Sequence, residues 1–401
     1  MPMLNRSTGD AVFSDLAVDI ERSFDRVESS LGEIMATNPA APEKGRGATF
    51  NPGNRFAHND REGFDDGWSA EVDRGEGMPA PLKTVVTIQP ARTIISRNDS
   101  PDIGFKQSIN PYQGCEHGCV YCYARPSHAY LDLSPGVDFE SRLFAKPEAA
   151  ALLRKEFDNP RYQPEVIVLG ANTDVYQPIE REWKITRSLL QVFLEYRHPV
   201  GLITKSALVE RDIDLLGQLA KLNLVRVFVS ITSLDKTLAR CMEPRAAAPH
   251  RRLETVKNLT DASIPVGVMT APIIPALNDA DMEAILEAAA ERGATMAGYT
   301  VIRLPYEIKD LFKAWLAQHY AQRAEHVMSV IRQMRGGKEY DSSFGQRMHG
   351  TGNFAELLES RFAIACRRLK LNRGQESPRT GLFQRPARGG QMSLFEQMQL
   401  L

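Results

Sequence analysis

Residues 107–122 read QSINPYQGCEHGCVYC, a predicted β-strand followed by three cysteines within eight positions. They are three of the five cysteines in the chain, namely Cys115, Cys119 and Cys122. Thiolates this close in sequence can converge on one metal centre, and Gly114 and Gly118 let the backbone wrap around it. An odd cysteine count with this clustering fits a metal site in a reducing compartment better than a disulfide framework.

Two kinds of metal centre fit this spacing. A zinc site needs a fourth ligand, for which His117 is the obvious candidate. An iron–sulfur cube held by three thiolates instead leaves one iron open to a substrate or cofactor. An ordinary buried loop is the third interpretation, and the spacing alone leaves all three open.

Short β-branched runs alternate with helical patterns from about residue 105 to residue 305. After a first strand at Gln107–Pro111, the runs are Glu165–Leu169, Val200–Thr204, Val225–Ile231, Pro265–Thr270 and Ala297–Ile302. The helical stretches between them include Thr186–Tyr196, Arg211–Leu222, Arg251–Ala262 and Asp279–Arg292. Near-continuous apolar strands separated by helices predict a parallel sheet covered on both faces. Six such units are typical of an open, partial βα barrel or of a doubly wound sheet, with ligands at the C-terminal ends of the strands.

The regions outside this repeat differ in charge. Residues 1–80 carry fifteen acidic and eight basic side chains, a net charge of −7, whereas residues 361–390 carry eight basic and one acidic, a net charge of +7. We therefore divide the chain into an acidic N-terminal extension (1–85), a βα region (86–307), a helical C-terminal region (308–370) and a basic flexible tail (371–401). The helical region is predicted to contain two helices, Lys309–Ile331 and Asn353–Leu369.

The acidic extension contains one predicted amphipathic helix. Its apolar residues recur at steps of three and four, and they are Val12, Leu16, Ile20, Phe24, Val27, Leu31 and Ile34. We expect this helix to dock on the main body or to pair with another chain, and residues 37–85 to form a loop or linker. The sequence shows no run of eighteen apolar residues and no secretory signal, so we expect a cytoplasmic protein with no membrane partner.

The CxxxCxxC loop, placed just after the first strand of a βα repeat, resembles the signature of the radical SAM superfamily. The resemblance implies a partial (β/α)6 barrel and a [4Fe–4S] cluster on Cys115, Cys119 and Cys122, with the fourth iron chelated by S-adenosylmethionine. It also implies an enzyme that cleaves this cofactor reductively and releases a 5′-deoxyadenosyl radical. Tyr121, the aromatic before the last cysteine, is placed as in the superfamily, where it lies beside the adenine. In such enzymes the cofactors carry the radical chemistry and the protein orients them.

Further motifs make the sequence similar to spore photoproduct lyase and its bacterial relatives. They are Cys119-Val-Tyr-Cys122-Tyr-Ala-Arg, Ala171-Asn-Thr-Asp174, Thr204-Lys205, Ser230-Ile-Thr-Ser233 and Glu243-Pro-Arg245. They span the 127 residues from Cys119 to Arg245 in the expected order. The cysteine triplet alone is specific for the superfamily, whereas the later motifs indicate the family only when they are taken together.

This resemblance implies cofactor contacts for several residues. Thr173 and Asp174 would lie beside the methionyl end of S-adenosylmethionine, and Lys205 and Ser230 would bind its polar groups. A zwitterion with ribose hydroxyls needs such a cation, anion and hydroxyl set. We add Arg245 as a bidentate clamp for the methionyl carboxylate. A helix cap at Asp174 and surface ion pairs at Lys205 and Arg245 are the structural alternatives.

One position departs from the family. Spore photoproduct lyase carries a hydrogen-donating cysteine where this chain has Ala171, and no cysteine lies between Cys122 and Cys241. Tyr123 matches a tyrosine that assists radical return in that family, so we assign it the catalytic role here. The departure puts thymine-dimer reversal by the same route in doubt.

Three partners are expected. The basic stretch from Arg367 to Arg388 could neutralise phosphates of DNA or another nucleic acid, or could be a solvated tail. Residues 391–395 (QMSLF) resemble the peptide by which bacterial DNA-repair and replication proteins dock on the sliding clamp. Leu394 and Phe395 would be its apolar anchors and Gln391 would fix the register. The third expected partner is an electron donor such as flavodoxin or ferredoxin.

Three functions therefore compete. The preferred one is a radical SAM enzyme that acts on DNA or another nucleic acid. The second is a radical SAM enzyme that acts on a small molecule or peptide. The third is a non-catalytic iron–sulfur or zinc module whose tail recruits partners.

Overall fold

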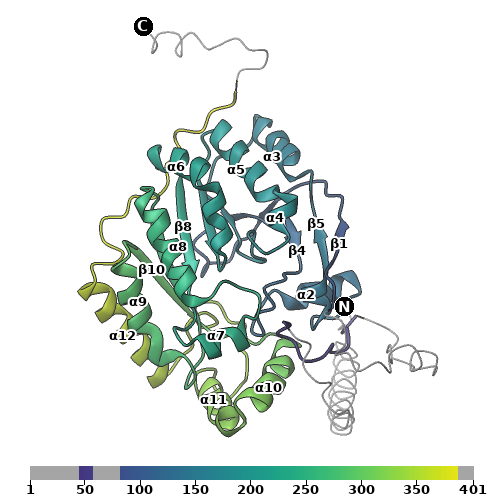
Figure 1. The fold of residues 1–401 in the computed structure, drawn as a ribbon, viewed down its shortest axis with the longest axis vertical. Coiled ribbons are helices and arrows are strands. Elements are labelled where there is room, and N and C mark those ends of the chain that lie inside the picture. Colours follow the sequence, from purple (N-terminus) through teal and green to yellow (C-terminus); the bar gives the residue numbers. More distant parts are fainter. Residues whose placement is uncertain (1–44, 57–81, 387–401) are drawn as a thin grey trace, which may run out of the picture. The chain divides into compact units, whose positions relative to one another are not determined.

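The computed structural model describes residues 45–56 and 82–386 of the chain (Figure 1). The chain divides into two compact units, residues 1–41 and 42–401, and all described residues belong to the second. The predicted N-terminal helix lies outside the described residues, and so does the clamp peptide with Gln391, Leu394 and Phe395. Both stay predictions.

The main sheet has the strand order β10-β9-β8-β7-β6-β3-β2. Its strands are β2 (Ile95–Arg97), β3 (Gln107–Ile109), β6 (Ile167–Leu169), β7 (Val200–Thr204), β8 (Val225–Ser230), β9 (Val266–Ile273) and β10 (Met296–Val301). All neighbours are parallel except β2, which pairs antiparallel with β3 at the edge. From β3 to β10 each parallel strand lies beside the next one in the chain, so the winding never reverses. The fold is therefore a partial (β/α)6 barrel and not a doubly wound sheet.

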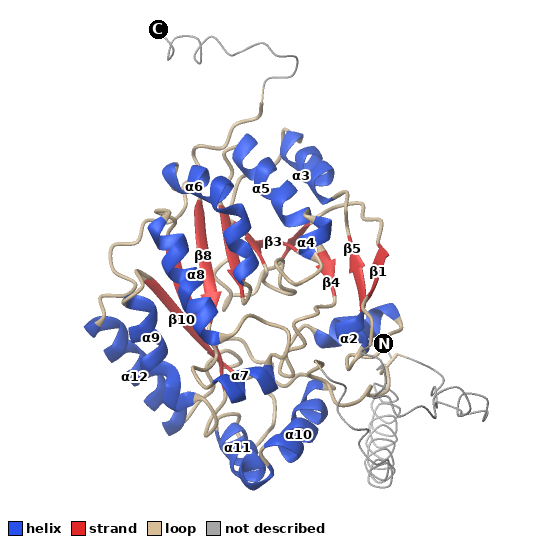
Figure 2. Ribbon diagram, in the orientation of Figure 1, coloured by secondary structure: helices blue, strands red, loops and turns tan. Residues whose placement is uncertain are grey.

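Helices follow the strands as the sequence periodicity predicts. Figure 2 shows α5, α6 and α8 along one face of the strands. The helices of the barrel are α3 (Ala149–Asp158), α4 (Glu180–Trp183), α5 (Ile185–Glu195), α6 (Ile213–Lys221), α7 (Lys236–Met242), α8 (Pro249–Asp261) and α9 (Met282–Ala290), with 3-10 turns η2 (Arg125–Leu131), η3 (Ala207–Asp212) and η4 (Asp279–Asp281). Ile167, Leu202 and Val227 lie on one face of the central strands and are completely buried, whereas alternate residues such as Ile203 and Phe228 are partly buried.

A second, small sheet supports the cysteine loop. Its order is β1 (Val85–Ile88), β5 (Arg142–Ala145) and β4 (Tyr112–Gln113), and α2 (Asp138–Ser141) leads into β5. Because β4 ends two residues before Cys115, the pairing of β4 with β5 fixes where the loop begins. The backbone N–H of Cys115 donates to the Phe139 carbonyl at 2.9 Å, which ties the loop to α2.

Part of the predicted linker packs against the same loop. The N–H groups of Gly47 and Ala48 donate to the buried carboxylate of Glu140, at 2.9 and 2.8 Å. A Cβ atom at Gly47 would stand 1.7 Å from the carbonyl oxygen of Gly118, so this position has room for glycine only. Residues 45–50 thus cover the cysteine loop directly.

The helical C-terminal region differs from the prediction at one point. It contains α10 (Ile308–His319), α11 (Ala321–Gln333) and α12 (Asn353–Arg368). The single helix predicted over Lys309–Ile331 was wrong, because the backbone leaves the helical region at Tyr320 (φ −141°, ψ 44°), whose ring packs 5.5 Å from that of Trp315. No helix in the described ranges is long and apolar enough to cross a membrane.

The basic segment predicted as a flexible tail packs on the barrel as far as residue 386. Asn372 bonds the backbone of Thr295 and Ala297, at the start of β10. Arg385 donates to the carbonyls of Phe157 and Asn159 at 2.8 Å. These contacts place the segment at the N-terminal ends of the strands, which is the end opposite to the cysteine loop.

Candidate functional site

The three thiols of the cysteine loop are shielded from water. Cys115 and Cys119 are buried and Cys122 is partly buried. Burial raises the pKa of the Cys115 thiol well above its usual value, and it raises the pKa of Cys119 to about 12. A buried thiolate is stable only beside positive charge. The loop therefore favours a bound cationic centre over free thiolates.

A buried ionic network lies behind Cys119. The Tyr121 hydroxyl and the Arg252 guanidinium both donate to the Glu243 carboxylate. Burial alone would raise the pKa of Glu243, but Arg252 and Lys205 outweigh it and lower that pKa. Burial alone would likewise lower the pKa of Lys205, but Cys119 and Glu243 raise it. Lys205 therefore keeps its positive charge 5.8 Å from the centre of the Tyr121 ring.

Asp174 joins three segments at the C-terminal ends of the strands. Its carboxylate accepts the Thr204 hydroxyl at 2.8 Å and the Lys205 N–H at 2.7 Å. It also lies 3.3 Å from Nδ1 of His117 in the cysteine loop. Burial would raise its pKa, but His117 and the backbone N–H donors lower it to about 2. The structure thus brings the predicted residues Asp174 and Lys205 together beside the cysteines.

Two other predicted cofactor residues are buried nearby, at the ends of β6 and β8. The Thr173 hydroxyl donates to the Tyr112 carbonyl at 2.8 Å. Ser230 is the last residue of β8, and its carbonyl accepts from Arg252 at 3.0 Å. Both residues therefore help to position the segments that carry Asp174 and Glu243.

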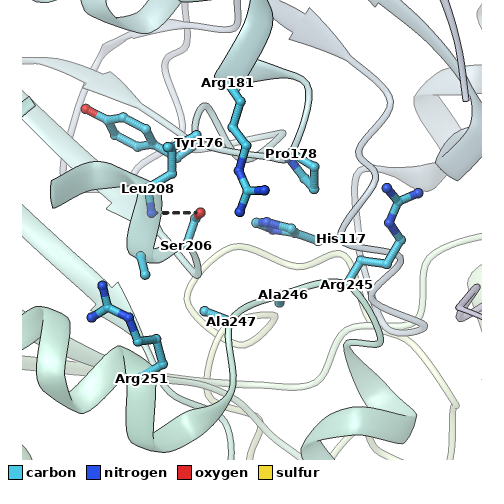
Figure 3. Close-up of a pocket in the computed structure, with 11 residues that line it drawn as sticks. His117, Tyr176, Pro178, Arg181, Ser206, Leu208, Arg245, Ala246, Ala247 and Arg251 are labelled. Atoms are coloured by element: carbon cyan, nitrogen blue, oxygen red, sulfur yellow. Dashed lines mark hydrogen bonds between the residues drawn. The ribbon is translucent and has the colours of Figure 1, made fainter. Parts of the chain in front are cut away.

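A cavity of about 450 Å³ opens beside the loop (Figure 3). It is lined by His117, Tyr176, Pro178, Arg181, Ser206, Ala207, Leu208, Arg245, Ala246, Ala247 and Arg251. Arg245, predicted as a carboxylate clamp, forms an ion pair with Glu116 at 2.9 Å. Arg245 therefore lines the cavity while its guanidinium is paired with the carboxylate of Glu116. The cavity has a cationic wall at the C-terminal ends of β6 and β7, where the βα repeat predicted ligand binding.

Tyr123 bridges the first and last parts of the barrel. Its hydroxyl donates to the carbonyl of Ala171, the position where the related lyase has cysteine. The Arg303 guanidinium, which follows β10, lies 4.5 Å over its ring. The Nε atom of Arg303 is buried without a hydrogen-bond partner among the described residues. The Tyr123 ring and the Arg303 guanidinium, whose Nε lacks a hydrogen-bond partner among the described residues, therefore pack together next to the cysteine loop.

The donor set fits an iron–sulfur cluster. Within residues 45–56 and 82–386, no three His, Cys, Asp or Glu side chains converge closely enough to hold a single metal ion. His117, the candidate fourth zinc ligand, contacts Asp174. A cluster of several irons spans more space than one ion, and thiolates are its usual ligands. The three thiols, with Lys205 behind Cys119, suit such a centre.

Comparison with known proteins agrees with this geometry. The family model described as Radical SAM superfamily matches residues 109–289. A protein of Mycobacterium tuberculosis is 32% identical over 230 residues, which cover 57% of this chain and 68% of that protein. This chain belongs to the radical SAM superfamily. A second relative, from Methanocaldococcus jannaschii, is 29% identical over 178 residues, 44% of this chain and 64% of the relative.

The radical SAM fold is also seen in a solved structure. Spore photoproduct lyase complexed with dinucleoside spore photoproduct superposes with a TM-score of 0.53 at 15% identity, over 71% of this chain and 79% of that one. At this identity the likeness concerns the fold. Membership of the radical SAM superfamily implies S-adenosylmethionine and an iron–sulfur cluster as cofactors.

Sequence reasoning missed several residues of the site. Arg125 follows the last cysteine by three residues and donates to the Cys119 carbonyl at 2.9 Å. Its guanidinium also pairs with Glu140, and both side chains are completely buried. The pattern CVYCYAR contained Arg125 but gave it no role, and no motif marked Glu140 or Arg303. These residues come from segments that only the fold brings together.

Proposed function

We propose that this protein is a radical SAM enzyme that holds a [4Fe–4S] cluster on Cys115, Cys119 and Cys122 and acts on DNA or another nucleic acid. The observation that carries the proposal is the group of three shielded thiols at the C-terminal end of the first barrel strand, beside Lys205 and Asp174. When bound, the cluster would supply the electron that cleaves S-adenosylmethionine to a 5′-deoxyadenosyl radical.

The residues around the loop match the polar groups of S-adenosylmethionine. Asp174 stays ionised and can bind an ammonium group, whereas Lys205 and Arg245 can bind a carboxylate. Thr173 and Ser230 hold the two segments that present these groups. Tyr121 presents its ring beside Lys205 and is the proposed neighbour of the adenine. The charges are thus fixed before the cofactor binds, which lowers the ordering cost of binding.

Tyr123 is the proposed hydrogen donor to a substrate radical. Its hydroxyl lies at Ala171, so it occupies the region from which a cysteine acts in the related lyase. Desolvation and the nearby Cys122 raise the pKa of Tyr123, which keeps the phenol protonated at neutral pH. The chain therefore supplies an O–H group where that family uses an S–H group.

A nucleic acid is the proposed substrate class on two grounds. Spore photoproduct lyase, which shares the fold, has been solved with a dinucleoside photoproduct, and fold likeness supports a substrate class by analogy alone. The C-terminal segment presents exposed Arg367, Lys370 and Arg373, which can neutralise phosphates. A small molecule or peptide is the alternative substrate and would share all the chemistry up to the radical.

The test compares anaerobically reconstituted wild type with Cys119→Ala and with Cys366→Ala. We expect Cys119→Ala to lose iron and the release of 5′-deoxyadenosine on addition of dithionite and S-adenosylmethionine. Cys366, a buried thiol of α12 outside the loop, is the matched control and should retain both. Retained cleavage in Cys119→Ala would remove the proposed site. A wild type that binds iron without cleaving the cofactor would leave a non-catalytic module.

A sliding clamp remains a proposed partner through Gln391, Leu394 and Phe395. Two adjacent apolar anchors and one amide suit a groove that binds a short peptide. We expect the double variant Leu394→Ala/Phe395→Ala to lose binding to an immobilised clamp. Unchanged binding would end this proposal and leave the enzymatic one intact.

A further inference from the structure

Three exposed aromatic rings surround one arginine next to the cysteine loop. Phe56, Tyr130 and Tyr306 are 50%, 74% and 63% exposed. The Arg55 guanidinium carbon lies 4.7 Å from the ring centre of Phe56, 5.6 Å from that of Tyr130 and 4.4 Å from that of Tyr306. Large aromatic rings are usually at least half covered in a folded protein, so three exposed ones at one point require an explanation.

The arginine holds these rings in a fixed arrangement. Arg55 binds Glu307 through two hydrogen bonds of 2.7 and 2.9 Å, across 252 residues of sequence. It also donates to the Pro126 carbonyl at 3.3 Å. The Phe56 and Tyr130 rings pack with their centres 5.0 Å apart. The carboxylate balances the charge of the guanidinium, so the cluster offers rigid ring faces and little net charge.

The cluster lies at the end of the barrel that carries the cysteine loop. Tyr130 belongs to η2, which follows Cys122, and Tyr306 follows the last residue of β10 by five positions. Tyr306 also has a φ of +52°, and it is the one aromatic among the described non-glycine residues with positive φ. Such a conformation costs free energy in a bulky residue and is most often retained at functional sites.

We propose that Phe56, Tyr130 and Tyr306 form a stacking platform for unpaired nucleobases of the substrate. The proposal rests on the proposed nucleic-acid substrate and states how that substrate is held. Every base has a π-face that stacks on an aromatic side chain regardless of sequence, and pre-ordered rings pay little entropy on binding. Arg303, three residues before Tyr306, has no carboxylate within ion-pair distance among the described residues, and its guanidinium lies over the Tyr123 ring.

The neutral Arg55–Glu307 pair argues for bases and against a purely ionic ligand. An anionic peptide or a headgroup would be attracted by excess positive charge, which the carboxylate of Glu307 removes here. Aromatic rings that stack on bases are instead the feature found in grooves that bind single strands.

The test measures binding of a fluorescent single-stranded oligonucleotide of about ten nucleotides, a length within the range of single-strand sites. We expect Tyr130→Ala and Tyr306→Ala each to weaken binding about tenfold, because each variant removes one ring on which a base stacks. Tyr306→Phe keeps the ring and should bind like wild type. Ile364→Ala, at a 60% exposed position of α12, is the matched control and should also bind like wild type. The slope of affinity against salt should not change, because stacking releases no counterions.

The outcomes separate this proposal from the one on which it rests. If wild type binds the oligonucleotide and the Tyr130→Ala/Tyr306→Ala double variant binds equally well, the platform is refuted and a nucleic-acid substrate remains. If wild type binds no oligonucleotide, the substrate class itself is refuted. If the double variant changes only the sedimentation of the protein, the cluster is a protein interface and the platform is again refuted. An abasic oligonucleotide should remove the difference between wild type and the alanine variants.

Discussion

Replacement of Glu140 by glutamine would test how the N-terminal segment is tied to the cysteine loop. The Glu140 carboxylate is completely buried, accepts the N–H groups of Gly47 and Ala48, and pairs with the equally buried Arg125. Arg125 in turn donates to the Cys119 carbonyl. Glutamine keeps an acceptor for the backbone but leaves the guanidinium without a counter-charge. Breaking a buried pair in this way costs about 3–5 kcal/mol.

The assay is urea unfolding of anaerobically purified protein, with limited proteolysis to follow residues 45–56. We expect Glu140→Gln to lower the free energy of unfolding by that amount and to speed cleavage in the segment. Glu195→Gln breaks the exposed pair with Arg154 and should cost at most about 1 kcal/mol. The double variant Arg125→Met/Glu140→Gln should recover part of the loss, because it leaves no unpaired buried charge and keeps an acceptor for the N–H groups of Gly47 and Ala48. Equal stability of Glu140→Gln and Glu195→Gln would refute the reasoning.

Three further predictions concern other parts of the molecule. Burial lowers the pKa of His198 to about 3, so the unfolded chain takes up a proton that the folded protein excludes. Between pH 7 and pH 5 the protonation of His198 in the unfolded chain should reduce the free energy of unfolding by about 2 kcal/mol. Urea titrations at the two pH values should show that the His198→Phe variant lacks this decrease of about 2 kcal/mol. Gly47→Ala forces a Cβ against the Gly118 carbonyl and should cost about 1–3 kcal/mol in the same assay, whereas Gly53→Ala has open space and should be neutral. The Tyr123→Phe variant should still bind iron and release 5′-deoxyadenosine, but it should form less product for each S-adenosylmethionine cleaved. Chromatography of both products measures this ratio. An unchanged ratio would exclude the phenol as hydrogen donor.

The sequence was sufficient for the βα repeat because its strands are short β-branched runs that alternate with helical patterns. Runs such as Val200–Thr204 are apolar without a break, which separates them from the 3.6-residue period of the helices. The cysteine site could also be predicted from the sequence, because its three candidate ligands lie on one short loop. The choice between a barrel and a doubly wound sheet needed the strand order, which spacing does not contain.

The remainder of the site depends on contacts between distant segments. The break at Tyr320 was missed because the helical period runs through it, and the packing of Tyr320 on Trp315 decides the break. Arg303 and Arg55 belong to no recognisable sequence motif. Each packs on an aromatic ring that is distant in sequence, Arg303 on Tyr123 and Arg55 on Tyr306. A single sequence shows local periodicity and local ligand sets, but it does not show which loops meet.

The two proposed contributions to nucleic-acid binding, phosphate contacts and base stacking, come from opposite ends of the barrel. The basic segment around Arg373 lies at the N-terminal ends of the strands, and Tyr306 lies at the C-terminal ends. The five residues of β7 alone separate these ends by about 16 Å, so phosphates bound by the tail are several nucleotides away from a base at the cysteine loop. Replacement of the exposed Arg367, Lys370 and Arg373 by glutamine should therefore weaken binding of long strands and reduce the salt slope, yet leave a strand of a few nucleotides unaffected. Tyr306→Ala should weaken both. If the glutamine variant weakens binding of short and long strands equally, the basic segment reaches the site and the separation of roles is wrong.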